Sequence, residues 1–255
     1  MASQWHNFQQ NLGEWRGSFT GISPEGQLLD TTPSVLTLEA HDAGQRVRFG
    51  LRRWPVGSPL AAGGGPGDGA GEPSRSMEQD YRTLGRQVVF FATGTFCKGA
   101  MQVAPNTPFG GEFGFIAGDR RHRLVHLWTE AGTLEQLVLI REFRAGSAAT
   151  EQPPAAVQQL RGCWQGQAAT ISADWPEPDL SEASLEFAAA DLAGLRWLPD
   201  GGVCRLPERV SHREAFVVEA GWLSQPDRLE WLMRRYDTSG AWQSATHLVL
   251  SRQQP

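Results

Sequence analysis

The chain has 255 residues, a net charge of -5 and a sequence pI near 5.7. An acidic balance argues against broad binding to nucleic acids and to anionic membranes, because both need a clustered basic surface. The length exceeds that of the usual single domain and predicts two domains, and the hydrophobic share of 40% is typical of a globular protein.

Targeting signals and metal-binding patterns are absent from the sequence. Residues 1–7 contain neither a basic nor an apolar stretch, so we expect no secretory or organelle leader. The densest apolar run, residues 88–92, is far too short to span a bilayer. Cys97, Cys163 and Cys204 lie far apart without a CxxC spacing, which favours reduced thiols over disulfides or a zinc site. We therefore expect a cytoplasmic protein without a metal or other cofactor.

The chain begins with a predicted short helix, which strands follow. Ser3 can cap this helix, and Trp5, Phe8 and Leu12 form an apolar stripe at helical spacing. Beyond it, apolar residues alternate with polar ones or form short runs between Gly, Pro and Asp turns. Many short strands and almost no helix predict an all-β fold of antiparallel sandwiches or barrels. The predicted strands include residues 46–52, 112–115, 124–128, 216–220 and 229–233.

Composition also marks a domain boundary. Residues 145–154 are small, polar and Pro-containing, as linkers are. The sequence thus predicts an N-terminal domain over residues 1–146 and a C-terminal domain over residues 153–255. A Gly-rich insertion near residues 61–76 lengthens the first domain. Its glycine run has too little apolar surface to offset the entropy of ordering it, so we expect a disordered loop.

Self-comparison indicates two copies of one unit. Trp15 in the segment NLGEWRG aligns with Trp164 in LRGCWQG at an offset of 149 residues. The same offset carries Leu36 onto Leu185, so the start and the middle of the two copies match in the same order.

The ends of the two copies match as well. LVLIR at residues 137–141 recurs as LVLSR at residues 248–252, each after a Gly-containing turn. The second copy, like the first, is expected to begin with a short helix, here after a Pro-Pro pair, with Val157 and Leu160 on one side.

A Trp-x-Gly motif on a first strand and an arginine on a last strand resemble the calycin superfamily of lipocalin-like barrels. That resemblance implies that Trp15 pairs with Arg141 and Trp164 with Arg252 across the floors of two tandem antiparallel barrels. A guanidinium over an indole contributes about 0.5–2 kcal/mol. These four residues are expected to be structural, and they do not identify a ligand.

A closer resemblance covers almost the whole chain. Residues 5–39, 96–99, 112–116 and 137–142 are similar to a cyanobacterial family of unknown function, related to the chloroplast biogenesis factor required for ATP synthase. The resemblance implies a non-enzymatic assembly factor that holds the β and γ subunits of the F1 head. Calycin barrels also enclose fatty acids, pigments or bilins, so a carrier of a small hydrophobic ligand, including a bilin-lyase-like role, is the alternative.

Local residue patterns give little support for a phosphate-binding loop, a metal site or a reactive thiol. The glycine run at residues 63–71 lacks the Gly-Lys-Ser/Thr of a phosphate loop and reads as a flexible loop. His122 and His126, four apart on a strand, would stand about 13 Å apart, too far for one metal. Cys97 beside Lys98 lacks a local catalytic partner, so a buried structural thiol is expected.

Two further sets of side chains are expected to pack. Cys163, next to the floor tryptophan, is expected to be buried. Four tryptophans are expected in the core, with a role as partner anchors as the alternative: Trp197, Trp222, Trp231 and Trp242.

Overall fold

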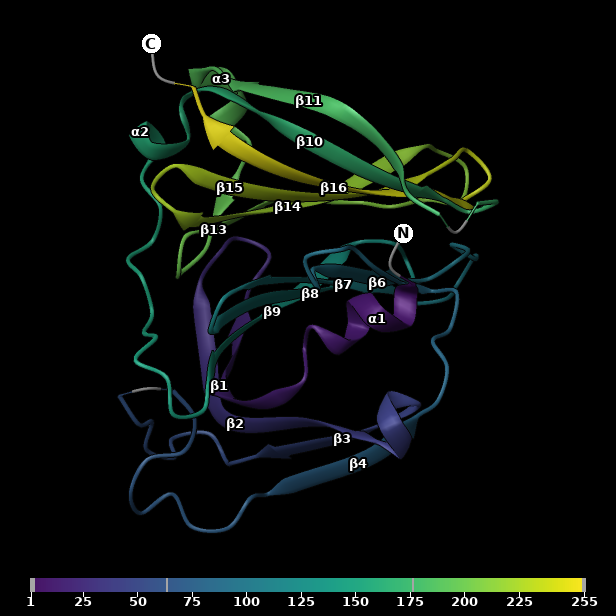
Figure 1. The fold of residues 1–255 in the computed structure, drawn as a ribbon. Coiled ribbons are helices and arrows are strands. Elements are labelled where there is room, and N and C mark those ends of the chain that lie inside the picture. The colour runs from purple at the N-terminus through teal and green to yellow at the C-terminus, as the bar shows by residue number, and fades with distance from the viewer. Residues whose placement is uncertain (1–2, 63, 176, 254–255) are drawn as a thin grey trace. The chain divides into compact units, whose positions relative to one another are not determined.

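The computed structural model describes residues 3–62, 64–175 and 177–253. Strands make up 55% of the chain and helices 7%, which confirms the predicted all-β class (Figure 1). The chain divides into two compact units, each described separately below. The first unit comprises Met1–Phe96, Gly114–Val125 and Leu137–Glu151; the second comprises Cys97–Phe113, His126–Gln136 and Gln152–Pro255.

The helices are short and the strands are many. The helices are α1 (Gln4–Gln9), the 3-10 turn η1 (Asp42–Gly44), α2 (Val157–Leu160) and α3 (Ala189–Ala193). The strands of the N-terminal repeat are β1 (Gly13–Ile22), β2 (Leu28–His41), β3 (Arg46–Arg53), β4 (Arg75–Tyr81), β5 (Val88–Phe90), β6 (Phe96–Gly99), β7 (Phe109–Ala117), β8 (Arg120–Trp128) and β9 (Leu134–Arg144). Those of the C-terminal repeat are β10 (Gly162–Ser172), β11 (Asp179–Phe187), β12 (Arg196–Trp197), β13 (Gly202–Arg205), β14 (Phe216–Gln225), β15 (Arg228–Tyr236) and β16 (Trp242–Arg252).

Each sheet is a curled antiparallel meander in which the first strand pairs with the last. The nine-stranded order is β4-β3-β2-β1-β9-β8-β7-β6-β5, and the seven-stranded order is β11-β10-β16-β15-β14-β13-β12. This is the lipocalin-like order of an up-and-down barrel. Among the described residues, no strand pairing joins β4 to β5 or β11 to β12, so each sheet remains open at one seam.

In the first unit, α1 covers the open edge at β5. Ser3 caps the helix as predicted, because its Oγ accepts a hydrogen bond from the backbone N–H of His6 at 3.2 Å. Asn7 Nδ2 donates to the carbonyl of Phe90 at 3.1 Å, and the N–H of Phe90 donates to Gln4 Oε1 at 2.7 Å. Both backbone groups of this edge residue therefore have side-chain partners, which blocks further strand pairing.

The core of the first unit lies between α1 and the concave face of β1–β3. Trp15 and Val47 are fully buried there, since alternate residues of each strand point inward. Phe8 of α1 packs edge-on against Tyr81 of β4 with ring centroids 5.8 Å apart. The remaining buried members are Leu36, Leu38, Phe90, Phe96 and Ile116.

The second unit has its own core, formed by the concave face of β10, β11, β15 and β16 together with α3. Trp164, Val203 and Leu229 are fully buried in it. The second helix forms after the Pro-Pro pair as predicted, but its Val157 is 43% exposed while Leu160 is buried, so the two do not share a packed side. The other buried members are Ala168, Phe187, Leu192, Leu195, Leu223, Trp231, Leu248 and Leu250.

Strand register confirms the start and the middle of the predicted repeat. Trp15 lies opposite Leu36 across β1 and β2, and Trp164 lies opposite Leu185 across β10 and β11. The offset of 149 residues therefore relates structurally equivalent positions.

The Gly-rich insertion folds back on β1. The N–H of Gly65 donates to the carbonyl of Gly17 at 3.1 Å, and Trp54 Nε1 donates to the carbonyl of Gly71 at 2.8 Å. Gly64 has φ of 77°, and a Cβ there would stand 2.7 Å from the ring of Phe143, so only glycine fits. The expectation of a disordered loop is therefore wrong for the described residues; residue 63 lies outside them.

Candidate functional site

The floor of the first unit contains a different arginine from the one predicted. Trp15 is fully buried, and its Nε1 donates to the carbonyl of Asn11 at 2.9 Å. Two guanidinium groups lie over its ring: the Cζ of Arg144 is 4.3 Å and that of Arg121 is 5.1 Å from the ring centroid. The predicted pairing of Trp15 with Arg141 is wrong.

Strand register gives the reason for this error. Arg144 lies directly opposite Trp15 across β1 and β9, whereas Arg141 lies opposite Ser18. Ser18 is an odd number of residues from Trp15, so Arg141 points to the other face of the sheet. There it donates to Thr20 Oγ1 at 2.9 Å and forms an ion pair with Glu151.

The second unit repeats the arrangement. Trp164 is fully buried, its Nε1 donates to the carbonyl of Leu160 at 2.8 Å, and the Cζ of Arg252 lies 4.6 Å from its ring centroid. Arg252 Nη1 donates to the carbonyl of Arg161, as Arg144 Nη1 donates to that of Leu12. We propose that these Trp–Arg pairs close the floor of each sheet and hold the preceding helix in place.

Arg234 of β15 is the most deeply buried cation of the second unit. It is 1% exposed; its Nε donates to the hydroxyl of Tyr236 at 2.8 Å, and its Nη2 donates to the carbonyl of Gly99 at 3.1 Å. Its Cζ lies 4.4 Å from the ring centroid of Trp242. Within this unit, Arg234 therefore joins the β6 segment to the C-terminal strands.

His126 of β8 is enclosed in the same unit. Its ring lies 5.1 Å from that of Phe113 and 5.2 Å from that of Trp128, measured between centroids. Burial, with a smaller effect from the positive charge of Arg234, lowers the pKa of His126 from 6.5 to about 3. The imidazole is therefore neutral at physiological pH.

Because its imidazole is buried in the neutral form, His126 is expected to make the stability of the folded state sensitive to acid. Below pH 6.5 the unfolded chain protonates His126, while the folded chain resists protonation until about pH 3. The folded state thus binds fewer protons, and the free energy of unfolding falls as the pH drops through this window, with a slope from this residue approaching about 1.4 kcal/mol per pH unit. Urea titrations between pH 7 and 5 should show a shallower slope for His126→Gln than for the wild type; equal slopes would contradict the prediction.

The two buried cysteines are not poised for reaction. Cys97 is fully buried, and burial raises the pKa of its thiol. Burial also raises the pKa of Cys204, to about 12. Cys163 is exposed, contrary to expectation, because its neighbour Trp164 points inward and successive residues of a strand alternate.

Neither a metal-binding cluster nor a membrane-spanning helix is found among the described residues. Across the described residues, no group of three or more His, Cys, Asp or Glu is placed to hold a metal ion. No helix in the described part of the chain is long and apolar enough to cross a membrane.

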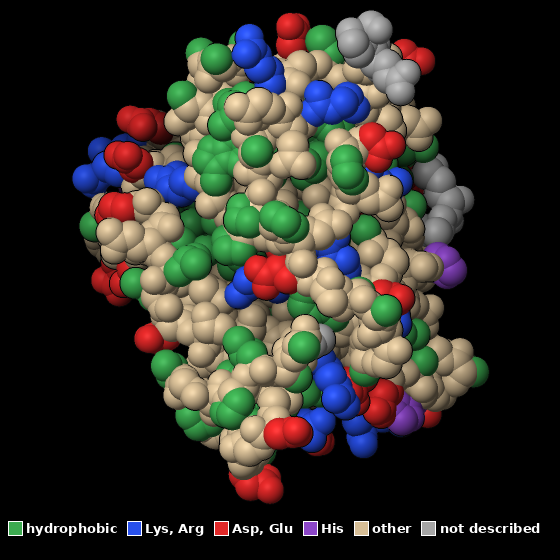
Figure 2. All heavy atoms as spheres, turned by 90° about the vertical axis from the view of Figure 1, so that its left-hand side faces the viewer, with side chains coloured by type: hydrophobic (Ala, Val, Ile, Leu, Met, Phe, Trp, Pro, Cys, Tyr) green, Lys and Arg blue, Asp and Glu red, His purple; other side chains and the backbone are tan. Residues whose placement is uncertain are grey.

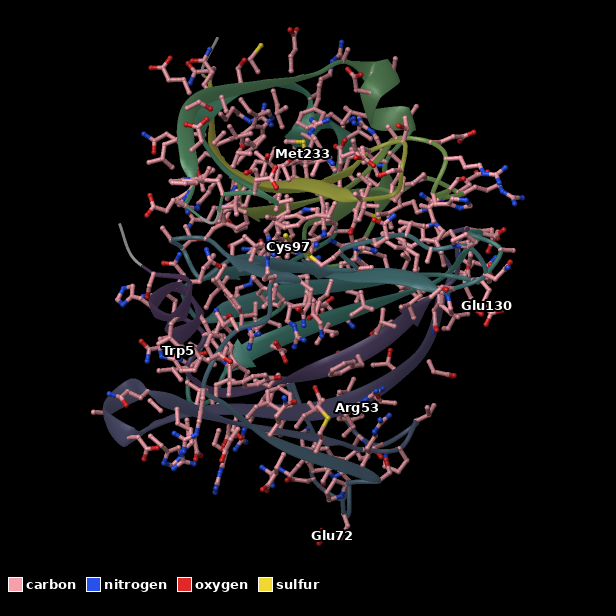
Figure 3. All side chains as sticks on the ribbon, turned by 90° about the vertical axis from the view of Figure 1, so that its right-hand side faces the viewer. Trp5, Arg53, Glu72, Cys97, Glu130 and Met233 are labelled. Carbon is pink, nitrogen blue, oxygen red and sulfur yellow. The ribbon has the colours of Figure 1, made fainter. Side chains whose placement is uncertain are left out.

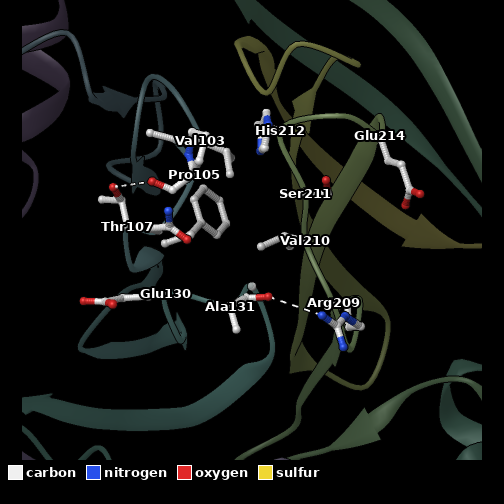
Figure 4. Close-up of a pocket in the computed structure, with 14 residues that line it drawn as sticks. Val103, Pro105, Thr107, Glu130, Ala131, Arg209, Val210, Ser211, His212 and Glu214 are labelled. Carbon is white, nitrogen blue, oxygen red and sulfur yellow. Dashed lines mark hydrogen bonds between the residues drawn. The ribbon is translucent and has the colours of Figure 1, made fainter.

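A pocket of about 480 Å³ opens among three loops of the second unit (Figure 4). The loops precede β7, join β8 to β9, and precede β14. Val210 N donates to the carbonyl of Gly132 at 2.8 Å, and Val103 N donates to the carbonyl of Gly240 at 2.8 Å, so main-chain bonds fix the walls. Arg209 Nη2 donates to the carbonyl of Ala131 at 3.4 Å.

The lining of this pocket is mixed in character. Val103 and Phe109 supply apolar wall, while Glu130, Arg209 and Glu214 supply charges of both signs. His212 and Ser211 also line it, without a recorded hydrogen bond between them that would indicate a nucleophile and its base. Among the residues that line it, no nucleophile is in hydrogen-bond contact with a base.

The outer surface carries exposed apolar side chains near the first hairpin of each repeat. Leu28 and Leu29 are 59% and 52% exposed at the start of β2, and Trp175 and Leu180 are each 63% exposed around the β10–β11 turn. Figure 2 shows one face of the molecule, on which basic, acidic and hydrophobic side chains are interspersed. Exposed aromatic and aliphatic groups of this kind are suited to contact with another protein.

Sequence reasoning found the floor tryptophans and missed these exposed groups. Trp222, Trp231 and Trp242 are buried, and Trp197 is half-buried against the core, as expected of core residues. Trp175 was not singled out, although its place in an Asp- and Pro-rich turn between two strands was a usable signal of exposure.

Comparison with known proteins gives two family matches. The N-terminal domain described as Domain of unknown function (DUF3598) matches residues 1–147. The C-terminal domain of Biogenesis factor required for ATP synthase 1 matches residues 151–193 and 181–253. No curated protein matches the chain significantly.

Among solved structures, a DUF3598 protein of unknown function from Nostoc punctiforme is 33% identical, covers 99% of this chain and 100% of its own, and superimposes with a TM-score of 0.86. An S-type phycobiliprotein lyase from Guillardia theta is 14% identical over 57% of this chain and 94% of its own, with a TM-score of 0.35. Kievitone hydratase from Nectria haematococca is 8% identical over 96% of this chain and 90% of its own, with a TM-score of 0.23. The last two likenesses are too weak to carry an argument.

Proposed function

Because the chain belongs to the DUF3598 family, and its C-terminal half matches the C-terminal domain of an ATP synthase biogenesis factor, we propose that it is a non-enzymatic protein-binding factor that assists assembly of ATP synthase. The observation that carries the proposal is the match over residues 151–193 and 181–253, which relates the C-terminal repeat to a named assembly factor. In finer detail, we propose that the chain holds the β and γ subunits of the F1 head.

The chemistry of the site supports binding over catalysis. The thiols of Cys97 and Cys204 are kept protonated by burial, and the imidazole of His126 is kept neutral. The pocket of the second unit contains mixed charges without a nucleophile and base in contact. A chain with two tandem all-β repeats can offer two contact surfaces, and linked surfaces raise the effective concentration of the second contact.

The inner faces of the sheets favour protein binding over a carrier of small ligands. Trp15 and Trp164 are fully buried on the concave faces, and Trp231 is 1% exposed. A barrel of about eight strands has room for its own side chains or for one small ligand. Because large aromatic side chains fill the inner faces, we base the proposal on the outer surface.

A deletion strain and a tagged chain test this function together. Tagged protein expressed in the native host should recover F1 β and γ subunits reproducibly, and deletion should lower the amount of assembled ATP synthase relative to a strain complemented with the wild-type gene. Recovery without F1 subunits, together with an unchanged amount of ATP synthase in the deletion strain, would refute the proposal.

A further inference from the structure

Strand β11 forms an open edge of the second unit. It pairs only with β10, and no other strand among the described residues lies along its far edge (Figure 1). Exposure alternates along the C-terminal part of this nine-residue strand. Leu185 and Phe187 face the core, while Leu180, Glu182 and Glu186 face outward. An edge strand of this length presents a row of backbone N–H and C=O groups to any extended chain.

Two of the other sheet edges, β5 and β12, are protected. Side chains of Gln4 and Asn7 occupy the backbone groups of Phe90 in β5, and β12 is only two residues long. Strand β4 is also an open edge, but it carries charges of both signs, and its Asp80 forms ion pairs with Arg46 and Arg48 of the neighbouring strand β3. Short strands, covering side chains and charged residues are usual means of blunting an edge. Strand β11 is nine residues long and carries charges of negative sign alone, which discourage self-pairing but leave the edge open to a basic strand.

The charges along β11 have one sign. Residues 172–187 contain five carboxylates and no lysine or arginine. In the described part of the chain, none of these carboxylates has a recorded ion pair, in contrast to the Asp80 pairs on β4. The five are Asp174, Glu177, Asp179, Glu182 and Glu186.

This charge pattern decides which chain can pair with β11. A second copy of β11 would place carboxylates opposite carboxylates, which is unfavourable across a strand pair, so self-pairing is disfavoured. A basic strand would instead place its cations beside Glu182 and Glu186, while its alternate residues would extend the apolar row of Ala183 and Leu185. Trp175 and Leu180, each 63% exposed, add apolar contact at one end.

We propose that β11 binds, by strand addition, an extended segment of a partner protein in which basic and apolar residues alternate. This rests on the proposed function as a protein-binding factor and names the chemistry of one partner segment. Backbone hydrogen bonds along the edge would pair the segment with β11. The carboxylates on the outer face would favour the alignment that places the basic residues of the segment beside them.

The probe that tests the proposal is a fluorescent nine-residue peptide of alternating arginine and valine, titrated into the full chain with anisotropy as readout. Two further versions carry N-methyl groups on all arginines or on all valines, so that each removes the N–H donors along one edge of the peptide. One of these two should lose binding, because alternate N–H groups of a strand point to the same side. Equal binding by all three peptides would show nonspecific charge attraction and overturn the proposal.

Charge reversal provides the matched variants. Glu182→Lys combined with Glu186→Lys should weaken peptide binding about tenfold or more, since two favourable cross-strand pairs become repulsive. Asp68→Lys with Glu72→Lys in the first unit changes the net charge equally and should leave the affinity unchanged; Figure 3 shows Glu72 pointing away from the sheet. Equal weakening by both double variants would overturn the proposal.

The failure of this inference is distinguishable from failure of the proposed function. If the Glu182→Lys and Glu186→Lys chain recovers F1 subunits like the wild type and the peptide does not bind, the edge is not the binding surface although the function stands. If the peptide binds β11 with the expected dependence on N-methylation and the wild-type chain recovers no F1 subunits, the edge inference stands and the assembly function is wrong.

Discussion

Replacing Trp164 with alanine is expected to lower the free energy of unfolding by about 3–5 kcal/mol, the usual cost of truncating a buried tryptophan. The side chain is fully buried, its Nε1 donates a hydrogen bond to the carbonyl of Leu160, and the guanidinium of Arg252 packs over its ring. The substitution leaves a cavity, the carbonyl of Leu160 without this donor, and the guanidinium of Arg252 without the ring beneath it. Chemical denaturation followed by circular dichroism measures the loss. Trp15→Ala should behave alike, because Trp15 occupies the equivalent position under Arg144.

Trp175→Ala is the matched control, because it removes the same side chain from a site that is 63% exposed. Surface substitutions usually change stability by less than about 0.5 kcal/mol. Similar losses for the Trp164 and Trp175 variants would contradict the assignment of Trp164 to the floor of the sheet.

Arg234→Met is expected to cost about 3–4 kcal/mol of the free energy of unfolding, because buried acceptors left without a donor cost about 1–3 kcal/mol each. The guanidinium binds the hydroxyl of Tyr236 and the carbonyls of Gly99 and Ala100, and it lies over Trp242. Methionine preserves much of the volume but donates no hydrogen bond. Arg234→Lys should recover only part of the loss, since an ammonium group lacks the planar fork that reaches several acceptors.

The neighbouring Arg235→Ala is the control for this prediction. Arg235 is exposed, and its recorded side-chain contact is a weak one to the sulfur of Met233 at 3.9 Å. Its removal should therefore leave the midpoint of unfolding almost unchanged. If Arg234→Met and Arg235→Ala were equally tolerated, the buried network around Arg234 would not stabilise the unit.

Two features of the fold could be predicted from the sequence, because side-chain alternation and repeated motifs indicate them directly. The offset between Trp15 and Trp164 predicted equivalent strands, and the register of each tryptophan against Leu36 and Leu185 confirms this. The all-β class followed from the same alternation. Helix α3 was not predicted, because a five-residue helix such as Ala189–Ala193 leaves little periodic signal.

The pairing of the last strand was not predictable from motif matching. LVLIR and LVLSR look equivalent, but the structure pairs Trp15 with Arg144 and Trp164 with Arg252. The sequence match is therefore displaced by three residues from the structural one, which moves Arg141 to the opposite face. Similar letters in two strands do not determine register, because hydrogen bonding to the neighbouring strand decides it.

The candidate binding surface was still less accessible to sequence reasoning. Whether β11 is an edge depends on which strands pair around it, and the acidic residues along it have meaning only after its neighbours are known. The exposure of Trp175 likewise depends on the turn that follows β10. Composition gave the net negative charge but not its concentration along one open strand.

The proposed function requires that this chain bind subunits of the F1 head directly. Isothermal titration of the purified chain with isolated F1 β subunit and, separately, with isolated γ subunit tests it without other host proteins. We expect saturable binding to at least one subunit, with no ATP hydrolysis by the chain itself. Absence of binding to both subunits, under conditions in which the chain is folded by circular dichroism, would contradict it.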